Sequence, residues 1–178
     1  VAFFAFFGTV VGYNFVKYDA IARLNKTEIK KELKVIVFLS FISLLACFYF
    51  FLQLSWMSKI SAFIFFGLTL LYTLPFFPNK QNARNWKGVK IYIVGITWVG
   101  VTVILPLVEA EIPFSIDIFL MAFQRFLLVF SIVLVFDIVD VKHDDIHLQT
   151  VPQKIGVEPT KKLGYVLLFL LLLLEFFY

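Results

Sequence analysis

Residues 117–145 read DIFLMAFQRFLLVFSIVLVFDIVDVKHDD, an apolar run followed by a cluster of aspartates. The apolar part, 117–136, has about the 20 residues that a helix needs to cross a hydrocarbon core of about 30 Å. Charge clusters at the edge of the apolar phase are costly and usually functional. We therefore predict a membrane-spanning helix that carries a carboxylate site where it leaves the membrane.

The spacing of the aspartates predicts that they share one helix face. At about 100° per residue, Asp137, Asp140 and Asp144 fall within roughly 60° of one another. Stacked carboxylates repel one another unless a cation lies between them, and Mg²⁺ is the hard cation that prefers carboxylate and phosphate oxygens. The alternative is a solvated polar cap on the end of a membrane helix.

The composition excludes an ordinary soluble domain. Of the 178 residues, 61% are hydrophobic and 19% aromatic, and the mean hydropathy is +0.93. The lone cysteine, Cys47, excludes an internal disulfide and a cysteine-based metal site. We expect an all-helical integral membrane protein that contacts membrane lipid and binds no nucleic acid.

Six apolar segments predict a polytopic helical bundle. We expect spans at 1–16, 35–54, 60–76, 91–108, 117–136 and 163–178. Both ends of the sequence lie inside apolar runs, so we expect one transmembrane domain over 1–178 that is truncated at both ends.

The basic residues predict the orientation of the bundle. Fourteen of the 16 Lys and Arg residues lie in the loops 17–34, 77–90 and 137–162. The positive-inside rule places these loops in the cytoplasm. The spans would then end at Asn14, Pro78 and Asp137 on one membrane face, where the three loops can converge.

Two further groups on that face are candidate anion ligands. Lys17 and Tyr18 follow Asn14 by three and four residues, so the three side chains share a helix face. Lys80 and Arg84 lie in the second basic loop. Together with metal-bound carboxylates, such cations can clamp a diphosphate. The alternatives are an interfacial anchor for the first group and solvated positive charge for the second.

Arg125 lies inside the span 117–136. An arginine within the membrane either faces the bundle interior and needs a partner, or extends outward towards the interface. The sequence leaves both arrangements open.

These residues resemble the motifs of the UbiA superfamily of intramembrane aromatic prenyltransferases. Asp137, Asp140 and Asp144 match the Asp-x-x-Asp-x-x-x-Asp motif after the family's sixth span. Thr150-Val151-Pro152 with Gly156 looks like the Thr-Leu-Pro and Gly that follow that motif, and Asn14 is similar to the first residue of the family's other motif. The resemblance implies that the chain covers the second to seventh of nine spans.

The first motif departs from the family pattern. Phe15 and Tyr18 stand where members usually have acidic residues, and Asp19 is displaced by one position. Our hypothesis is that Asn14, Lys17 and Tyr18 contact the diphosphate directly, with the ammonium group of Lys17 replacing a metal charge.

The resemblance implies Mg²⁺-dependent transfer of a prenyl group from an isoprenyl diphosphate to an unidentified acceptor, in a bacterial inner membrane. It also implies that Asp137, Asp140 and Asp144 hold the metal, and we place Asn14, Lys17, Tyr18, Lys80 and Arg84 at the diphosphate. The alternative is a degenerate relative that binds an isoprenoid or a lipid headgroup without transfer. A third reading, an ion or proton pathway, is disfavoured because the carboxylates lie at the end of a span.

Overall fold

The computed structural model describes residues 1–24, 31–74, 88–142 and 149–177, with the side chains of 16–24, 31–32 and 177 excepted. Every regular element in these ranges is helical, which confirms the predicted all-α class. The elements are α1 (Ala2–Leu24), α2 (Lys31–Leu52), α3 (Trp56–Thr73), α4 (Lys90–Val99), the π-helix η3 (Gly100–Ile104), α5 (Leu105–Glu109), α6 (Ile116–Asp140), α7 (Val151–Ile155) and α8 (Val157–Phe177).

Four helical segments in the described residues are long and apolar enough to cross a membrane. They are Leu33–Leu52, Trp56–Thr73, Lys90–Glu109 and Ile116–Asp140, and they match four of the six predicted spans. The apolar part of α1, Ala2–Phe15, is shorter. The expected last span lies in α8, a helix that carries Lys161, Lys162 and Glu175. The structure therefore supports an integral membrane protein with four such helices.

Helix boundaries differ from the predicted loops in two places. The first basic loop was expected to begin at residue 17, but α1 continues to Leu24. The third, 137–162, contains the last turn of α6, the whole of α7 and the start of α8. Hydropathy marks the apolar part of a helix, whereas backbone hydrogen bonding continues into the polar residues beyond it.

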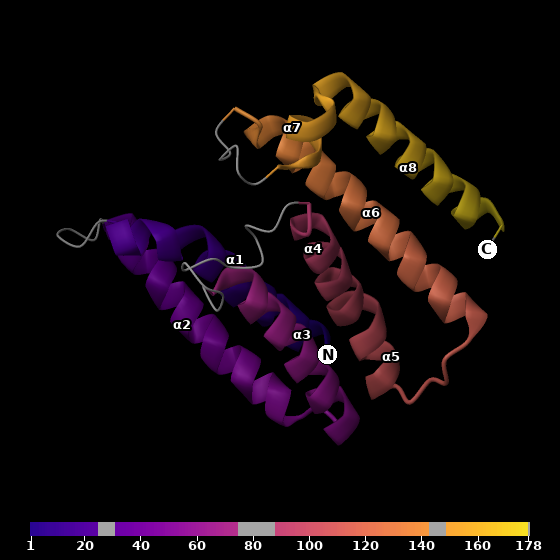
Figure 1. Cartoon of the computed structure of the whole chain (residues 1–178). Helices are drawn as coiled ribbons and strands as arrows, with labels where there is room; N and C mark the ends of the chain where they lie inside the picture. The colour runs from indigo at the N-terminus through magenta and orange to yellow at the C-terminus, as the bar shows by residue number, and fades with distance from the viewer. Residues whose placement is uncertain (25–30, 75–87, 143–148, 178) are drawn as a thin grey trace.

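The helices form two outer pairs with a central rod between them. In Figure 1, α1 packs against α2 on one side and α6 packs against α8 on the other, while α4, η3 and α5 run end to end between them. The rod contacts α3 as well as α6. Aromatic rings join the helices on the first side: Phe3 stacks on Phe50 at 5.2 Å, and Phe51 meets Phe63 of α3 edge-on at 5.4 Å.

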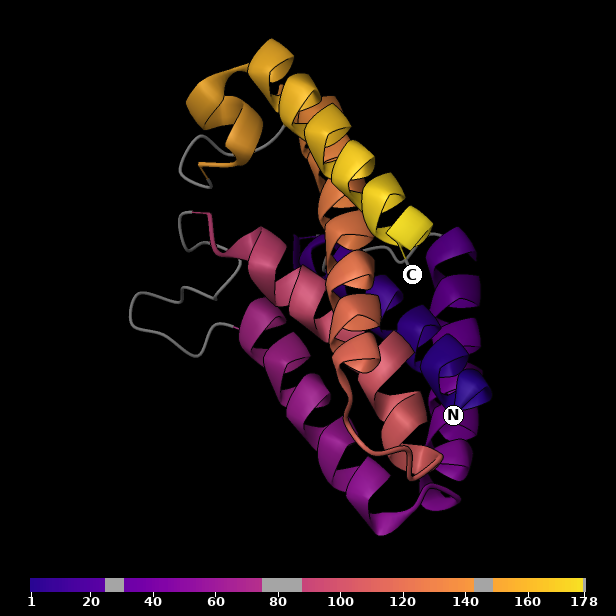
Figure 2. The same cartoon turned by 90° about the vertical axis from the view of Figure 1, so that its right-hand side faces the viewer.

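One end of the bundle collects the ends of three helices and the starts of three others. The helices α1, α3 and α6 end there, and α2, α4 and α8 begin there, as the antiparallel connections require (Figure 1). We call this the polar end. The short helix α7 folds back over it, and α8 then returns alongside α6 (Figure 2).

The central rod changes pitch at η3 because of a proline. Pro106 has no amide hydrogen, and its ring would clash with the carbonyl four residues earlier in a regular helix. The Leu105 N–H instead donates to the Gly100 carbonyl, which is the wider π-type hydrogen bond. Gly100 also allows close packing, since a Cβ there would overlap the ring of Phe65 in α3.

Arg125 does not face the bundle interior. Its side chain is exposed on the outer surface of α6. The neighbouring Gln124 donates its Nε2 to Glu175 Oε2 of α8 at 3.3 Å. Of the two arrangements that the sequence left open, the structure favours the outward one.

Candidate functional site

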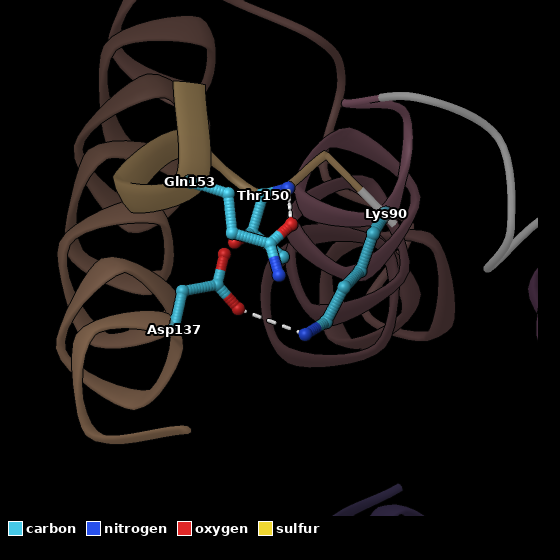
Figure 3. Close-up of polar contacts among 4 residues, drawn as sticks. All are labelled: Lys90, Asp137, Thr150 and Gln153. Carbon is cyan, nitrogen blue, oxygen red and sulfur yellow. Dashed lines mark hydrogen bonds and ion pairs between the residues drawn. The ribbon is translucent and has the colours of Figure 1, made fainter. Parts of the chain in front are cut away.

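The predicted carboxylate site begins with Asp137, which is buried near the end of α6. Its side chain is only 3% exposed, and Oδ1 accepts a hydrogen bond from Lys90 Nζ at 2.8 Å (Figure 3). The Lys90 side chain is 20% exposed and belongs to the first residue of α4. The first aspartate of the motif is therefore half of an ion pair between two helices.

The arrangement of the spans brings this pair together. Because α4 begins and α6 ends at the polar end, the first residue of one helix lies at the level of the last turn of the other. Ile91, which follows Lys90, and Leu134, one turn before Asp137, belong to one buried apolar cluster with Val129 and Val133. The ion pair thus caps an apolar layer, where electrostatic attraction is screened less than in water.

The helix α7 covers the ion pair from above. Thr150 is its N-cap residue, and the Thr150 N–H donates to Gln153 Oε1 at 3.0 Å. Pro152 fits the first turn, where an amide hydrogen would have no helical partner. Gly156 takes φ +89°, a conformation that few other residues adopt, and so lets the chain turn into α8. The Thr-x-Pro and Gly positions of the motif thus have local structural roles.

The covering helix places one buried hydroxyl close to the ion pair. Thr150 is 4% exposed, and its hydroxyl is the capping-box oxygen at the start of α7, beside the backbone N–H of Gln153. In Figure 3 the side chains of Asp137, Thr150 and Gln153 point towards one another, and Lys90 reaches in from the facing helix. The hydroxyl therefore lies in the same buried polar layer as Asp137.

The other predicted carboxylates are not gathered beside Asp137 by the described residues. Asp140 is exposed, although it lies only one turn further along α6. Asp144 lies outside the described residues. Across the described ranges, no group of three His, Cys, Asp or Glu side chains is close enough to hold a metal ion. The proposed trio therefore stays a prediction.

Asn14 is engaged with a neighbouring helix. Its Nδ2 donates to Ser40 Oγ of α2 at 2.9 Å, and that hydroxyl donates to the Ile36 carbonyl at 2.8 Å. The structure thus pairs Asn14 with α2 and Asp137 with α4. The side chains of Lys17 and Tyr18, and the whole of Lys80 and Arg84, lie outside the described residues, so their predicted contact with a diphosphate stays a prediction.

An apolar groove lies below the polar end, between α3, the central rod and α6. It has a volume of about 240 Å³ and is lined by Phe65, Ile96, Val99, Gly100, Ile104, Phe119, Ala122, Phe123 and Phe126. From the rise of 1.5 Å per residue, Ile96 is about 9 Å and Phe126 about 16 Å along their helices from the Lys90–Asp137 pair. Phe65 therefore lines this apolar space, whereas Phe3 and Phe66 are exposed on the outer surface.

Comparison of the chain with protein-family models, with curated proteins and with solved structures finds no match. A function must therefore be argued from the side chains at the polar end and the chemistry that they allow.

The oxygen atoms at this end suit a hard divalent cation. Mg²⁺ prefers carboxylate and hydroxyl oxygens. Asp137 supplies a carboxylate, Thr150 supplies a hydroxyl, and Asp140 supplies a second, exposed carboxylate one turn away. The ammonium group of Lys90 already balances the charge of Asp137, so a bound cation would compete with it. These oxygen types are the ones that Mg²⁺ prefers, but the described residues do not gather three acidic or histidine side chains around one point, so the metal site stays a prediction.

Lys90 and Gln153 are the site residues that the sequence did not single out. Lys90 was counted only among the cations of the second basic loop. The sequence did contain a signal for the pairing of Lys90 with Asp137. A lysine that begins one span and an aspartate that ends a neighbouring antiparallel span lie at the same depth in the membrane. Gln153 carries no comparable signal, since its role depends on α7 folding back over α6.

Proposed function

We propose that the chain is an intramembrane prenyltransferase that moves a prenyl group from an isoprenyl diphosphate to an acceptor in the membrane. The observation that carries the proposal is the burial of Asp137, the first aspartate of the motif, at the polar end, where it faces a lysine above an apolar layer. A polar site of this kind suits a diphosphate, and the apolar groove below suits a hydrocarbon chain.

The side chains of the polar end would bind and neutralise the leaving group. Negative charge builds up on the diphosphate as the carbon–oxygen bond breaks, and cations fixed nearby stabilise it in that transition state. Lys90 supplies one such cation, and Lys17, Lys80 and Arg84 are the others that we propose. When bound by Asp137, Asp140 and Asp144, Mg²⁺ would add positive charge at the diphosphate oxygens.

The groove would hold the prenyl chain and keep water away from the allylic cation. Its walls are aromatic and aliphatic, with Phe65, Phe123 and Phe126 among them. Exclusion of water prevents hydrolysis of a reactive intermediate. We further propose that the polar end faces the cytoplasm of a bacterial cell, and that the helices correspond to the second to seventh spans of a nine-span UbiA-type fold.

Pyrophosphate release tests this function directly. The full-length protein is reconstituted in lipid nanodiscs with an allylic diphosphate such as farnesyl diphosphate, and pyrophosphate is measured with and without Mg²⁺. We expect Mg²⁺-dependent release that Asp140→Asn abolishes. Because Asp140 is exposed, this change should leave folding intact. Asp117→Asn, an exposed aspartate at the opposite end of α6, is the matched control and should leave release unchanged. Release that persists in Asp140→Asn would refute the proposal.

The Lys90–Asp137 ion pair itself favours a second candidate function. A carboxylate that already has an ammonium partner does not need a metal, and the acids usual in the first motif are replaced by Phe15 and Tyr18. Such a protein would bind an isoprenoid or phospholipid headgroup without transferring a prenyl group. Binding of farnesyl diphosphate with no release of pyrophosphate, in the same nanodiscs, would support this alternative.

A further inference from the structure

We propose that Lys90 is a built-in counter-ion. Its ammonium group pairs with Asp137 while the site is empty and pairs with the diphosphate instead when metal and substrate bind. This inference rests on the proposed function and adds a residue to it. The consequence is that metal and diphosphate assist each other in binding, because the lysine that leaves the carboxylate is then available to the anion.

The first step is that Asp137 needs a cation at all times. Its side chain is 3% exposed and lies on the apolar cluster of Ile91, Val133 and Leu134. An ionised carboxylate in such surroundings is strongly destabilising without a partner. Lys90, at 2.8 Å, supplies that partner in the structure.

The second step is that Lys90 can leave. Its side chain is 20% exposed, so one side of it already reaches the surface of the polar end. Lysine has a flexible four-carbon stem and binds its partner as a point charge, unlike the fixed two-pronged contact of arginine. The pair is therefore asymmetric, with a fixed carboxylate and a movable cation.

The third step is that other donors surround the carboxylate. Thr150 is 4% exposed, and the Thr150 and Gln153 side chains point towards Asp137 (Figure 3). A hard cation that replaces the ammonium group would thus find a second oxygen already in place. Lysine and metal compete for one carboxylate, and removal of the lysine should expose that competition.

Two binding measurements with opposite expected signs test the exchange. Mn²⁺ serves as the metal probe, and its binding to the full-length protein in nanodiscs is followed by electron paramagnetic resonance. We expect Lys90→Gln to bind Mn²⁺ at least about tenfold more tightly than the unchanged protein, because a positive charge next to the carboxylate has been removed. Radiolabelled inorganic pyrophosphate, at saturating Mg²⁺, should bind at least about tenfold more weakly to Lys90→Gln, because one cation of the anion site is missing.

The matched control is Lys161→Gln. Lys161 is also at the polar end and pairs with Glu158 at 2.6 Å, but the pair is exposed. This variant loses the same charge and should leave both affinities within about twofold, because exposed charges are screened by solvent and salt. Asp137→Asn should lose tight Mn²⁺ binding.

Lys90→Arg keeps the test decisive if Lys90→Gln does not fold. Arginine retains the charge and grips a carboxylate through two hydrogen bonds, so Mn²⁺ binding should weaken several-fold relative to the unchanged protein. The exchange is wrong if Lys90→Gln binds Mn²⁺ no more tightly than the unchanged protein does. It is also wrong if Lys90→Arg binds Mn²⁺ as tightly as the unchanged protein does.

The outcome separates this inference from the proposed function. Unchanged Mn²⁺ affinity in the Lys90 variants, with Mg²⁺-dependent pyrophosphate release intact in the unchanged protein, overturns only the exchange. Absence of both Mn²⁺ binding and pyrophosphate release in the unchanged protein overturns both.

Discussion

Replacing Lys90 by methionine should destabilise the protein more than replacing its partner Asp137 by leucine. In the first variant the carboxylate of Asp137, which is 3% exposed above an apolar cluster, loses its ammonium partner. Removal of one partner from a buried ion pair costs about 3–5 kcal/mol. In the second variant the stranded group is a lysine that is 20% exposed and can turn its ammonium group to water. We expect a smaller cost there, about 1–3 kcal/mol, the usual range for a polar group that loses a hydrogen-bond partner.

The double variant should recover most of the loss. Lys90→Met with Asp137→Leu removes both charges and leaves two apolar side chains of similar size on the layer formed by Ile91 and Leu134. Replacement of a buried ion pair by apolar residues is often neutral or stabilising. We therefore expect the double variant to lie within about 1 kcal/mol of the unchanged protein, so the two single costs are strongly non-additive.

The free energy of unfolding is measured by titration of the detergent-solubilised protein with sodium dodecyl sulfate, followed by far-UV circular dichroism. The reactivity of the thiol of Cys47, the single cysteine, gives a second probe at the contact between α1 and α2, where Cys47 Sγ lies 3.8 Å from the Phe4 carbonyl. Lys161→Met is the control, because its exposed pair with Glu158 should contribute no more than about 1 kcal/mol. Equal and additive costs for Lys90→Met and Asp137→Leu would refute the reasoning.

Three further changes can be measured with the same titration. Gly100→Ala places a Cβ on the ring of Phe65 and should cost about 1–3 kcal/mol. The control Gly67→Ala has open space around its Cβ and should stabilise the protein by about 0.5–1 kcal/mol. An unchanged stability of Gly100→Ala would contradict the packing of the rod on α3. Glu109→Gln weakens the bond that Glu109 Oε2 accepts from the Ser55 N–H at 3.0 Å and should cost about 1 kcal/mol, with the exposed Glu111→Gln unchanged; equal effects would show that this bond adds nothing. Thr150→Val removes the capping-box hydroxyl at the start of α7 and should cost about 1 kcal/mol, so an unchanged stability would show that this cap adds nothing.

The sequence was sufficient to predict the helical class and four of the long apolar helices. A helix that crosses a membrane must be apolar and about 20 residues long, and both properties can be read from the sequence. Four of the predicted apolar segments coincide with helices that can cross a membrane. The antiparallel order of those helices follows from their short connections, which places the ends of α1, α3 and α6 together. Hydropathy could not give the extension of α1 to Leu24 or the formation of α7, because both occur in polar sequence where backbone hydrogen bonds and capping residues decide the structure.

Part of the candidate site was also readable from the sequence, but its partners were not. Asp137 is recognisable because an acidic residue at the end of an apolar run is costly. Its pairing with Lys90 depends on which helices are neighbours, and the basic loop offered several equivalent cations. The covering residues Thr150 and Gln153 depend on α7 folding back over the end of α6, which no local sequence signal specifies.

Asp137 and Asp140 show why helical spacing alone does not define a site. The two residues are three apart, so an ideal helix points them in directions that differ by about 60°. Spacing gives direction but not depth: α7 packs over the last turns of α6 and buries Asp137, while Asp140 is the final residue of the helix and stays exposed. A buried carboxylate with a resident cation is fixed in position and supports the fold, whereas an exposed one is free to change partners without cost to the fold. The two aspartates of one motif therefore cannot be interchangeable. A ligand that bound both would have to displace the Lys90 ammonium group from Asp137, but only water from Asp140.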